Sequence, residues 1–360
     1  MAGDGERLNS KIHLHRRGCA DILGLEKAAW MCDSPGLDEE HCNSQQRAGP
    51  PPGFRAHSRA ATGMNSKNTK PRVAFMGLGI MGSGMARRLL AAGFPLAVFN
   101  PDPSKSAPFA AEGARVAPTP LDAATGASII ISMVADDAAS RALWLGENGA
   151  LAAASPGAVI IECSTVTVAC VHELSAAATA RGCEMLDAPV TGSKPQAASG
   201  ELTFLVGGAE AALEKARSLL SVMGRSIVHV GPVGGGALLK LINNFLCGVQ
   251  TASLAEGLAL IERSGLDRAR ALEVLATGAP GSPAVKNFSA RMAARDYTPL
   301  FRLRLMAKDL RYACQEAARR EMELVTAAAA LRLFDKSLAA GDGDKDVSSL
   351  VEQFRSNRKT

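Results

Sequence analysis

Residues 73–82 of the chain read VAFMGLGIMG. The apolar run Val73–Met76 predicts a strand, and the G-x-G-x-x-G turn that follows leads into an amphipathic stretch reaching about Ala92. The first glycine of such a turn permits the tight bend, the second lets a pyrophosphate approach the backbone, and the third lets the helix pack close to the strand. The helix start then presents free N–H groups to an anion. This context predicts a dinucleotide site formed by Gly77, Leu78, Gly79, Ile80, Met81 and Gly82.

Short apolar runs alternate with helical stretches as far as Gly231. Further strands are expected at residues 96–99, 129–134, 159–162, 184–186, 202–206 and 227–230. Such alternation predicts a mostly parallel sheet with helices on both faces. We therefore expect an α/β fold: a Rossmann-type doubly wound domain at residues 71–231, followed by an all-helical C-terminal domain at residues 232–360.

The helical domain is expected to begin with a long helix from about Gly235 to Ser264, ended by Gly265. Apolar residues cover most of the circumference of this helix, so it is predicted to be buried on several sides. Burial against both the first domain and a partner subunit would account for this pattern. We therefore expect a homodimer or a homotetramer.

Residues 1–70 differ in composition from the rest of the chain. They contain scattered charges, the run Pro50-Pro51-Pro52 and no sustained periodicity, so we expect a disordered extension. Because the composition changes abruptly near Met64, one hypothesis is that the functional protein starts there. Full activity of a chain beginning at Met64 would support this hypothesis, and loss of folding would refute it.

Composition and charge exclude several classes of protein. The net charge of the chain is only +5, and its Lys and Arg residues are scattered among acidic residues, so no nucleic-acid partner is expected. No run of about 18 apolar residues predicts a membrane span, and the N-terminus lacks a secretory signal. The eight cysteines contain no C-x-x-C pair and are interpreted as free thiols, and no metal site is predicted. By default, these features favour a cytoplasmic protein.

The end of the second predicted strand bears on the choice of cofactor. An acidic residue there would bind the ribose 2′-hydroxyl of NAD and repel the phosphate of NADP. The chain instead has the neutral Asn100, while Ser104 and Lys105 could contact a phosphate and Asp102 would oppose it. These residues favour NADP slightly over NAD.

Lys240 is the candidate for proton transfer. It lies a few residues into the long helix and has apolar neighbours, which desolvate an ammonium group and lower its pKa. Asn244 follows four residues later, on the same helix face, where it could bind a substrate. Alternatively, Lys240 is an ordinary lysine extending from a buried helix, and Asn244 forms a hydrogen bond between helices.

Five motifs match one family in order: GLGIMG at 77–82, ECST at 162–165, DAPVTGSKPQAASGEL at 187–202, GPVGGGALLKLINN at 231–244 and KDL at 308–310. Through them, residues 72–355 resemble the β-hydroxyacid dehydrogenases, a family that includes 3-hydroxyisobutyrate dehydrogenases, tartronate semialdehyde reductases and glyoxylate/succinic semialdehyde reductases. The resemblance implies that Lys240 is catalytic. For the substrate it implies Ser164, Thr191, Gly192, Ser193 and Asn244. For the cofactor it implies Asn100, Met133, Val134, Thr165 and Lys308 besides the glycine turn.

The chain departs from the family at some of these positions. Many relatives have Asp in place of Glu162 and Ser in place of Thr191, and Gln196 replaces a frequent Gly. The resemblance therefore predicts an NAD(P)-dependent interconversion of a small β-hydroxyacid and its semialdehyde, without identifying the substrate. Two alternatives are an imine reductase, whose members usually lack the lysine, and a non-catalytic dinucleotide-binding module.

Overall fold

The computed structural model describes residues 70–355, so nearly all of the expected N-terminal extension lies outside the described residues. Residues 73–231 form a mostly parallel sheet with strand order β3-β2-β1-β4-β5-β6-β8-β7, in which β9 pairs with β8. The strands are β1 (Val73–Met76), β2 (Leu96–Phe99), β3 (Arg115–Val116), β4 (Ile129–Ser132), β5 (Val159–Glu162), β6 (Glu184–Asp187), β7 (Val190–Thr191), β8 (Leu202–Gly208) and β9 (Gly224–Gly231).

The strand order confirms the predicted doubly wound sheet. From β1 the chain moves outward to β2 and β3, and then returns to β4 on the other side of β1, with every one of these pairs parallel. This reversal places the carboxyl ends of β1 and β4 next to each other, which is where such sheets bind ligands. The sheet is not parallel throughout, because β8 runs antiparallel to β6 and β7.

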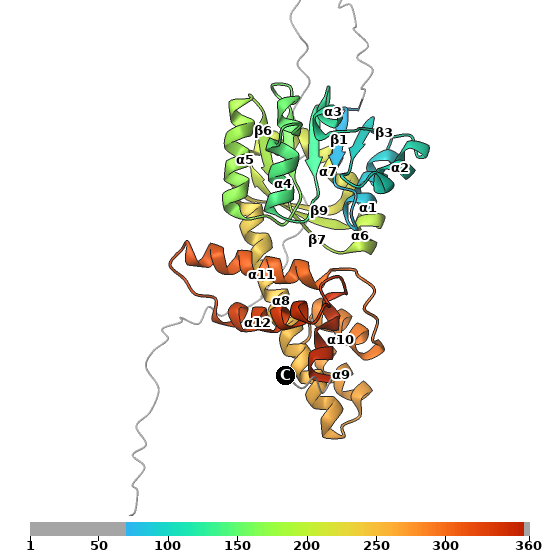
Figure 1. Cartoon of the computed structure of the whole chain (residues 1–360), viewed down its shortest axis with the longest axis vertical. Coiled ribbons are helices and arrows are strands. Elements are labelled where there is room, and N and C mark those ends of the chain that lie inside the picture. The colour runs from blue at the N-terminus through green and yellow to red at the C-terminus, as the bar shows by residue number, and fades with distance from the viewer. Residues whose placement is uncertain (1–69, 356–360) are drawn as a thin grey trace, which may run out of the picture. The chain divides into compact units, whose positions relative to one another are not determined.

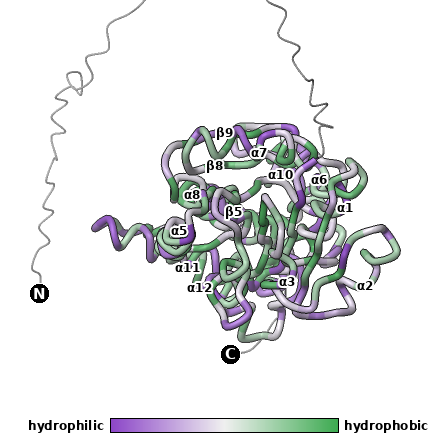
Figure 2. The backbone as a smooth tube through the Cα atoms, turned by 90° about the horizontal axis from the view of Figure 1, so that it is seen from above, coloured by the Kyte–Doolittle hydropathy of each residue, from purple (hydrophilic) through white to green (hydrophobic). Residues whose placement is uncertain are grey.

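Helices cover both faces of the sheet and bury its apolar strands in two cores. Figure 1 shows this layered arrangement, and in Figure 2 many of the segments inside it have the green colour of hydrophobic residues. One core includes α1 (Gly82–Ala91), α2 (Pro103–Ala111), α6 (Lys194–Ser199) and α7 (Glu210–Met223); the other includes α3 (Pro120–Ala124), α4 (Asp137–Leu145), η1 (Ala150–Ala152) and α5 (Val168–Ala180).

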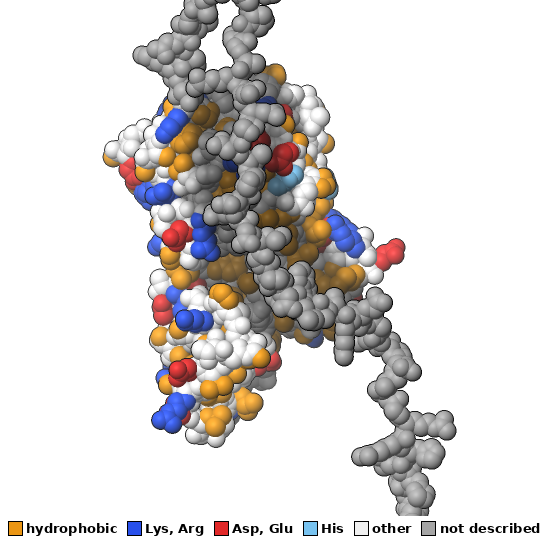
Figure 3. All heavy atoms as spheres, turned by 180° about the vertical axis from the view of Figure 1, so that it is seen from behind, with side chains coloured by type: hydrophobic (Ala, Val, Ile, Leu, Met, Phe, Trp, Pro, Cys, Tyr) orange, Lys and Arg blue, Asp and Glu red, His pale blue; other side chains and the backbone are white. Residues whose placement is uncertain are grey.

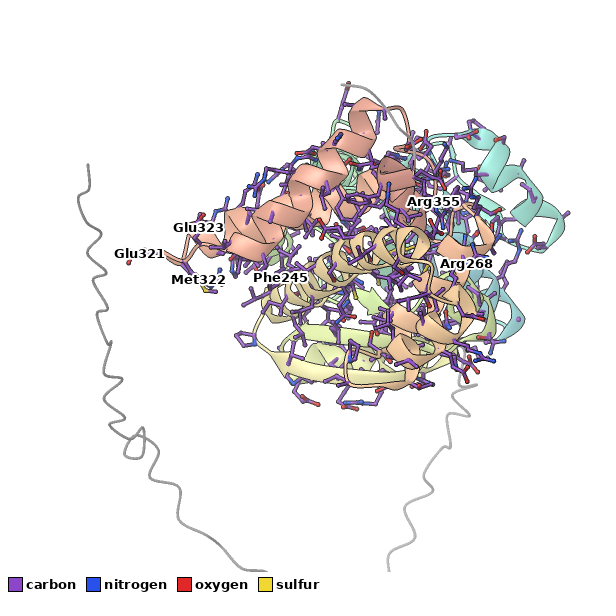
Figure 4. All side chains as sticks on the ribbon, turned by 90° about the horizontal axis from the view of Figure 1, so that it is seen from below. Phe245, Arg268, Glu321, Met322, Glu323 and Arg355 are labelled. Atoms are coloured by element: carbon purple, nitrogen blue, oxygen red, sulfur yellow. The ribbon has the colours of Figure 1, made fainter. Side chains whose placement is uncertain are left out.

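The region after β9 is helical, as predicted, and has its own core. Its first helix ends at Gly265, whose φ of 78° is the left-handed conformation that favours glycine. The turn between its two antiparallel helices α11 and α12 carries Glu321, Met322 and Glu323, which point outward in Figure 4. Its elements are α8 (Gly235–Ser264), α9 (Arg268–Thr277), α10 (Pro283–Ala294), α11 (Leu303–Ala318), α12 (Val325–Ala339), η2 (Val347–Val351) and α13 (Glu352–Arg355).

The α8 helix is less enclosed than its sequence predicts. Leu239, Ile242 and Leu246 share one face and are 36%, 43% and 51% exposed within the chain. Contrary to our expectation that no segment could span a membrane, α8 is long and apolar enough to do so. Half of the most apolar 18-residue stretch of α8 is buried inside the protein, however, and the core helix of a soluble protein can be equally long and apolar.

The charged side chains are mixed on the surface. On the face drawn in Figure 3, Lys and Arg side chains lie among Asp and Glu side chains. Many of them form exposed ion pairs, such as those of Arg87 with Glu112 and of Lys215 with Glu184. Such pairs contribute about 0–1 kcal/mol each, so the cores hold the fold together.

Candidate functional site

The glycine turn after β1 has the shape that a pyrophosphate requires. A Cβ atom at Gly82 would lie 1.9 Å from the carbonyl oxygen of Gly77, and one at Gly77, whose φ is 96°, would lie 2.2 Å from that of Met133. A Cβ atom at Gly79 would meet nothing within 4 Å. The α1 helix that follows has no side-chain cap and no acidic residue in its first turn. The turn therefore leaves open space beside free N–H groups, and these residues fit a dinucleotide.

The rest of the predicted turn lies around this space. Leu78 is buried, whereas Ile80 and Met81 are partly exposed. The amide of Leu78 donates to Asn100 Oδ1 at 2.9 Å, so Asn100 ties the end of β2 to the turn. Gly77 also lies close to Val134, which brings the loop after β4 to the same place.

Asp102, Ser104 and Lys105, which follow Asn100, contact one another. Asp102 caps α2 by accepting hydrogen bonds from the backbone N of Ser104 at 3.0 Å and from its hydroxyl at 2.6 Å. These hydrogen bonds hold the pKa of Asp102 below its ordinary value. Lys105 lies 3.6 Å from the same carboxylate. Both groups that were expected to favour a 2′-phosphate are thus engaged by Asp102.

Ser164 was expected to bind a substrate, but its side chain is buried. It is 1% exposed, and its hydroxyl accepts a hydrogen bond from Val134 N at 2.7 Å. Its own amide donates to Glu162 Oε1 at 2.8 Å. The other oxygen of Glu162 accepts hydrogen bonds from Ser140 and Trp144 of α4, at 2.6 and 2.9 Å. This buried network fixes the loops after β4 and β5 to each other.

Lys308 reaches from α11 to the same two loops. Its Nζ donates to the carbonyl oxygens of Ala135 at 2.7 Å and Thr165 at 2.6 Å. It also lies 3.0 Å from Asp309 Oδ1, in an ion pair that lacks hydrogen-bond geometry. Lys308 and Thr165, which were both predicted to bind the cofactor, thus contact each other, and this lysine is bound to the protein backbone.

Lys240 is partly exposed and lies in a setting that suits proton transfer. Burial lowers its pKa below the ordinary value of 10.5, whereas the charge of Asp309 acts in the opposite direction. Within residues 70–355, its ammonium group forms neither a hydrogen bond nor a salt bridge. A lysine with a lowered pKa and an unpaired ammonium gives up its proton more readily than an exposed lysine, which suits it to proton transfer.

Asn244 is buried and fully engaged. Its amide donates to Asp309 Oδ2 at 2.6 Å, and its Oδ1 accepts from Asn243 at 3.0 Å. This contact is the hydrogen bond between helices that was the alternative interpretation of Asn244. It also joins α8 to α11, so Asn244 and Asp309 connect Lys240 to the loops that Lys308 holds.

The loop of Thr191, Gly192 and Ser193, here called the substrate loop, follows β6 at the same edge of the sheet. Gly192 has a φ of 116°, and Thr191 is partly exposed in β7. Ser193 caps α6 in a capping box with Gln196, whose Oε1 accepts hydrogen bonds from the backbone N and the hydroxyl of Ser193 at 3.0 and 2.8 Å. Gln196, noted above as a departure from the family, thus orients a residue of this loop.

Sequence reasoning missed the buried carboxylates of the site. Glu162 entered only as a departure from the family, Asp309 only as part of a motif, and Asp187 was given no role. Glu162 and Asp187 are each the last residue of an apolar strand. An acidic residue at that position, on the ligand-binding edge of a sheet, is the signal that could have found them.

Known proteins resemble this chain over nearly all of its described residues. The family described as the NAD binding domain of 6-phosphogluconate dehydrogenase matches residues 72–231, and the NAD-binding domain of NADP-dependent 3-hydroxyisobutyrate dehydrogenase matches residues 234–354. An NAD-dependent L-serine dehydrogenase of Pseudomonas aeruginosa is 38% identical over 290 residues, which cover 79% of this chain and 97% of that protein.

Two further comparisons extend this similarity. The chloroplastic glyoxylate/succinic semialdehyde reductase 2 of Arabidopsis thaliana is 35% identical over 283 residues, 79% of each chain. Among solved structures, the 3-hydroxyisobutyrate dehydrogenase of Mycobacterium tuberculosis with L-serine has 32% identity and a TM-score of 0.73. That similarity covers 80% of this chain and all of the other.

Proposed function

Because the chain belongs to the β-hydroxyacid dehydrogenase family and is an NAD(P)-dependent oxidoreductase acting on CH–OH groups, we propose that it interconverts a small β-hydroxyacid and its semialdehyde, with Lys240 as general acid and base. The observation that carries this proposal is the free ammonium of Lys240, whose pKa is lowered by burial. The contacts of Lys308 and Asp309 connect it to the loops beside the glycine turn.

A nicotinamide bound at the glycine turn would supply the hydride for reduction of an aldehyde, and this reduction places negative charge on the aldehyde oxygen. Lys240, protonated, donates a proton to that oxygen; in the oxidising direction the neutral amine accepts the proton of the alcohol. Such help raises rates by about 10² to 10⁴. Lys240 is therefore expected to act in its protonated form in reduction and in its neutral form in oxidation, and the lowering of its pKa favours the neutral form.

The substrate loop supports a proposal about the class of substrate. Among the donors of the substrate loop, the hydroxyl and N–H of Ser193 are used by Gln196, which leaves the Thr191 hydroxyl and the Gly192 N–H to bind a substrate carboxylate. L-serine is a β-hydroxyacid, and the relative from Pseudomonas aeruginosa is named for its oxidation. We therefore propose small substrates that carry both a carboxylate and the reacting CH–OH group or aldehyde, and L-serine, in which one carbon separates the two groups, is among them.

The test measures NADH and NADPH oxidation with glyoxylate and with succinic, tartronate and methylmalonate semialdehydes, and the reverse reaction with L-serine and 3-hydroxyisobutyrate. Wild type is compared with Lys240→Ala and Lys240→Arg. The alanine variant should lose about 10² or more in kcat, as expected for a lost general acid. Arginine keeps the charge but does not deprotonate, so it should not restore oxidation.

Outcomes of this assay separate the parts of the proposal. Equal kcat for wild type and Lys240→Ala would refute the role of the lysine. Absence of turnover in wild type, despite measurable cofactor binding, would refute the substrate class. The ratio of the two cofactors' kcat/KM tests the slight preference for NADP, and a much lower KM for NADH would overturn it.

We further propose that the protein is a homodimer or homotetramer in the cytoplasm. The exposed apolar face of α8 supports self-association, since Leu239, Ile242 and Leu246 would otherwise face water. Sedimentation at micromolar concentration should give a species larger than the monomer, and Leu246→Lys should shift it toward the monomer. Sedimentation of the wild type as a monomer would refute the proposed assembly.

A further inference from the structure

The carboxylate of Asp187 is fully buried and accepts two backbone hydrogen bonds from the start of α8. Its Oδ1 lies 2.8 Å from Gly234 N, and its Oδ2 lies 2.7 Å from Ala237 N. Gly234, the N-cap residue, has a φ of 95° and no side chain with which to cap the helix. Asp187 therefore satisfies two N–H groups that would be left without partners at the helix start.

The backbone around Asp187 holds this carboxylate in one place. A Cβ atom at Gly207 would lie 2.4 Å from Asp187 Oδ1, and one at Gly236 would lie 2.6 Å from the carbonyl oxygen of Asp187. Both distances are far inside van der Waals contact, so these positions have room only for glycine. The carboxylate is thus packed closely between the backbone of β8 at Gly207 and the first turn of α8 at Gly236.

Asp187 stands between the two segments that the proposed function requires. It ends β6, directly before the chain that leads into the substrate loop, while Ala237 precedes Lys240 by three residues, about one helical turn. We propose that Asp187 is a positioning residue: its two hydrogen bonds fix the height and rotation of the first turn of α8, and so hold Lys240 in register with the substrate loop. This inference rests on the proposed role of Lys240.

The charge of this group distinguishes it from an ordinary helix cap. A neutral Ser, Thr or Asn cap accepts a backbone hydrogen bond at one oxygen, whereas both oxygens of Asp187 are used. Burial raises the pKa of Asp187 to about 6, against the effect of the two backbone N–H groups and of the nearby His172 of α5.

The experiment compares Asp187→Asn, Lys240→Ala and the double variant. The matched control is Asp267→Asn, since Asp267 caps α9 by accepting from Arg270 N at 3.0 Å. Turnover is measured with glyoxylate and succinic semialdehyde and with L-serine and 3-hydroxyisobutyrate. Thermal unfolding, NADH and NADPH binding and hydrogen exchange of residues 234–240 are measured in parallel.

Asn retains one acceptor and turns a donor toward the second N–H, so Asp187→Asn should lower kcat at least tenfold. Hydrogen exchange in residues 234–240 should become faster, while the Kd for NADH or NADPH should stay within twofold of wild type. The double variant should be no slower than Lys240→Ala, because a residue that acts through Lys240 has no effect in its absence. Asp267→Asn should match the wild type in kcat.

Additive losses in the double variant, or unchanged kcat and exchange in Asp187→Asn, would overturn the inference. A Lys240→Ala variant as active as wild type would instead refute the proposed function, so the two failures are distinguishable. Should Asp187→Asn not fold, Ala237→Pro removes the N–H that Oδ2 binds and leaves the carboxylate intact, because proline is tolerated in the first helical turn. It should show the same loss of kcat, and wild-type turnover would overturn the inference.

Discussion

Replacing Lys308 by Met should both destabilise the protein and weaken cofactor binding. The Lys308 ammonium donates to the carbonyl oxygens of Ala135 and Thr165 at 2.7 and 2.6 Å and pairs with Asp309 at 3.0 Å. Its side chain is 15% exposed, so water cannot replace all of these contacts. Methionine keeps the length of the chain and its apolar contacts, and removes only the charge and the donors.

The magnitude follows from these contacts. A hydrogen bond to a charged group contributes about 1.5–3 kcal/mol, and removal of one partner of a buried ion pair costs about 3–5 kcal/mol. Because the contacts share one ammonium, their contributions overlap, and we expect a total loss of about 3–5 kcal/mol. At about 2–4 °C per kcal/mol, Tm should fall by roughly 6–20 °C.

Urea unfolding and titration with NADH and NADPH measure the two effects. Lys215→Met is the control, because the ion pair of Lys215 with Glu184 is exposed and should be worth at most about 1 kcal/mol. The Kd for the cofactor should rise at least tenfold in Lys308→Met alone, since both loops lose an anchor. If Lys308→Met unfolds like the control, the contacts of Lys308 do not hold the two loops, and the reasoning is wrong.

Two further predictions concern the glycine turn and the buried acid. Gly79→Ala should keep the wild-type Tm but weaken cofactor binding, because its Cβ would meet no protein atom within 4 Å and would fill the open space of the turn. Gly82→Ala should lower Tm, because its Cβ would lie 1.9 Å from Gly77 O. Calorimetry and cofactor titration distinguish the two variants, and equal Tm values would contradict the prediction. Since the folded pKa of Asp187, about 6, exceeds its ordinary 3.8, the protonated form favours folding. As the pH rises from about 4 to 6, the free energy of unfolding of wild type should therefore fall by about 3 kcal/mol relative to that of Asp187→Asn. Urea unfolding at each pH measures this difference, and a difference that does not change with pH would contradict the prediction.

Much of the fold could be predicted from local patterns. The strand Val73–Met76 and the helix Gly235–Ser264 have the predicted bounds, because an apolar run and a terminal glycine are local signals. The short strand Val190–Thr191 was not predicted, and neither was the antiparallel direction of β8. Both depend on which strand lies alongside, a tertiary property that apolar periodicity does not contain.

The site was predictable where its residues are close in sequence and not where they are distant. The spacing of Lys240 and Asn244 places both on one face of α8, but nothing in that spacing indicates that Asn244 binds Asp309, which is 65 residues away. Ser164 was expected at a ligand because of its motif, and the structure instead buries its hydroxyl against Val134. Hydroxyls and amides form protein contacts as readily as ligand contacts, and only the surroundings distinguish the two.

The ends of two neighbouring strands explain why the loop after β5 and the start of α8 lie at one edge of the sheet. Glu162 and Asp187 are register partners at the carboxyl ends of the parallel strands β5 and β6. A buried carboxylate is costly unless hydrogen bonds satisfy it. Glu162 obtains one of them from Ser164, and Asp187 obtains two from the start of α8. Satisfying these adjacent acids therefore brings the loop after β5 and the helix of Lys240 to one edge of the sheet, so that the hydrogen bonds of two buried acids also assemble the proposed site.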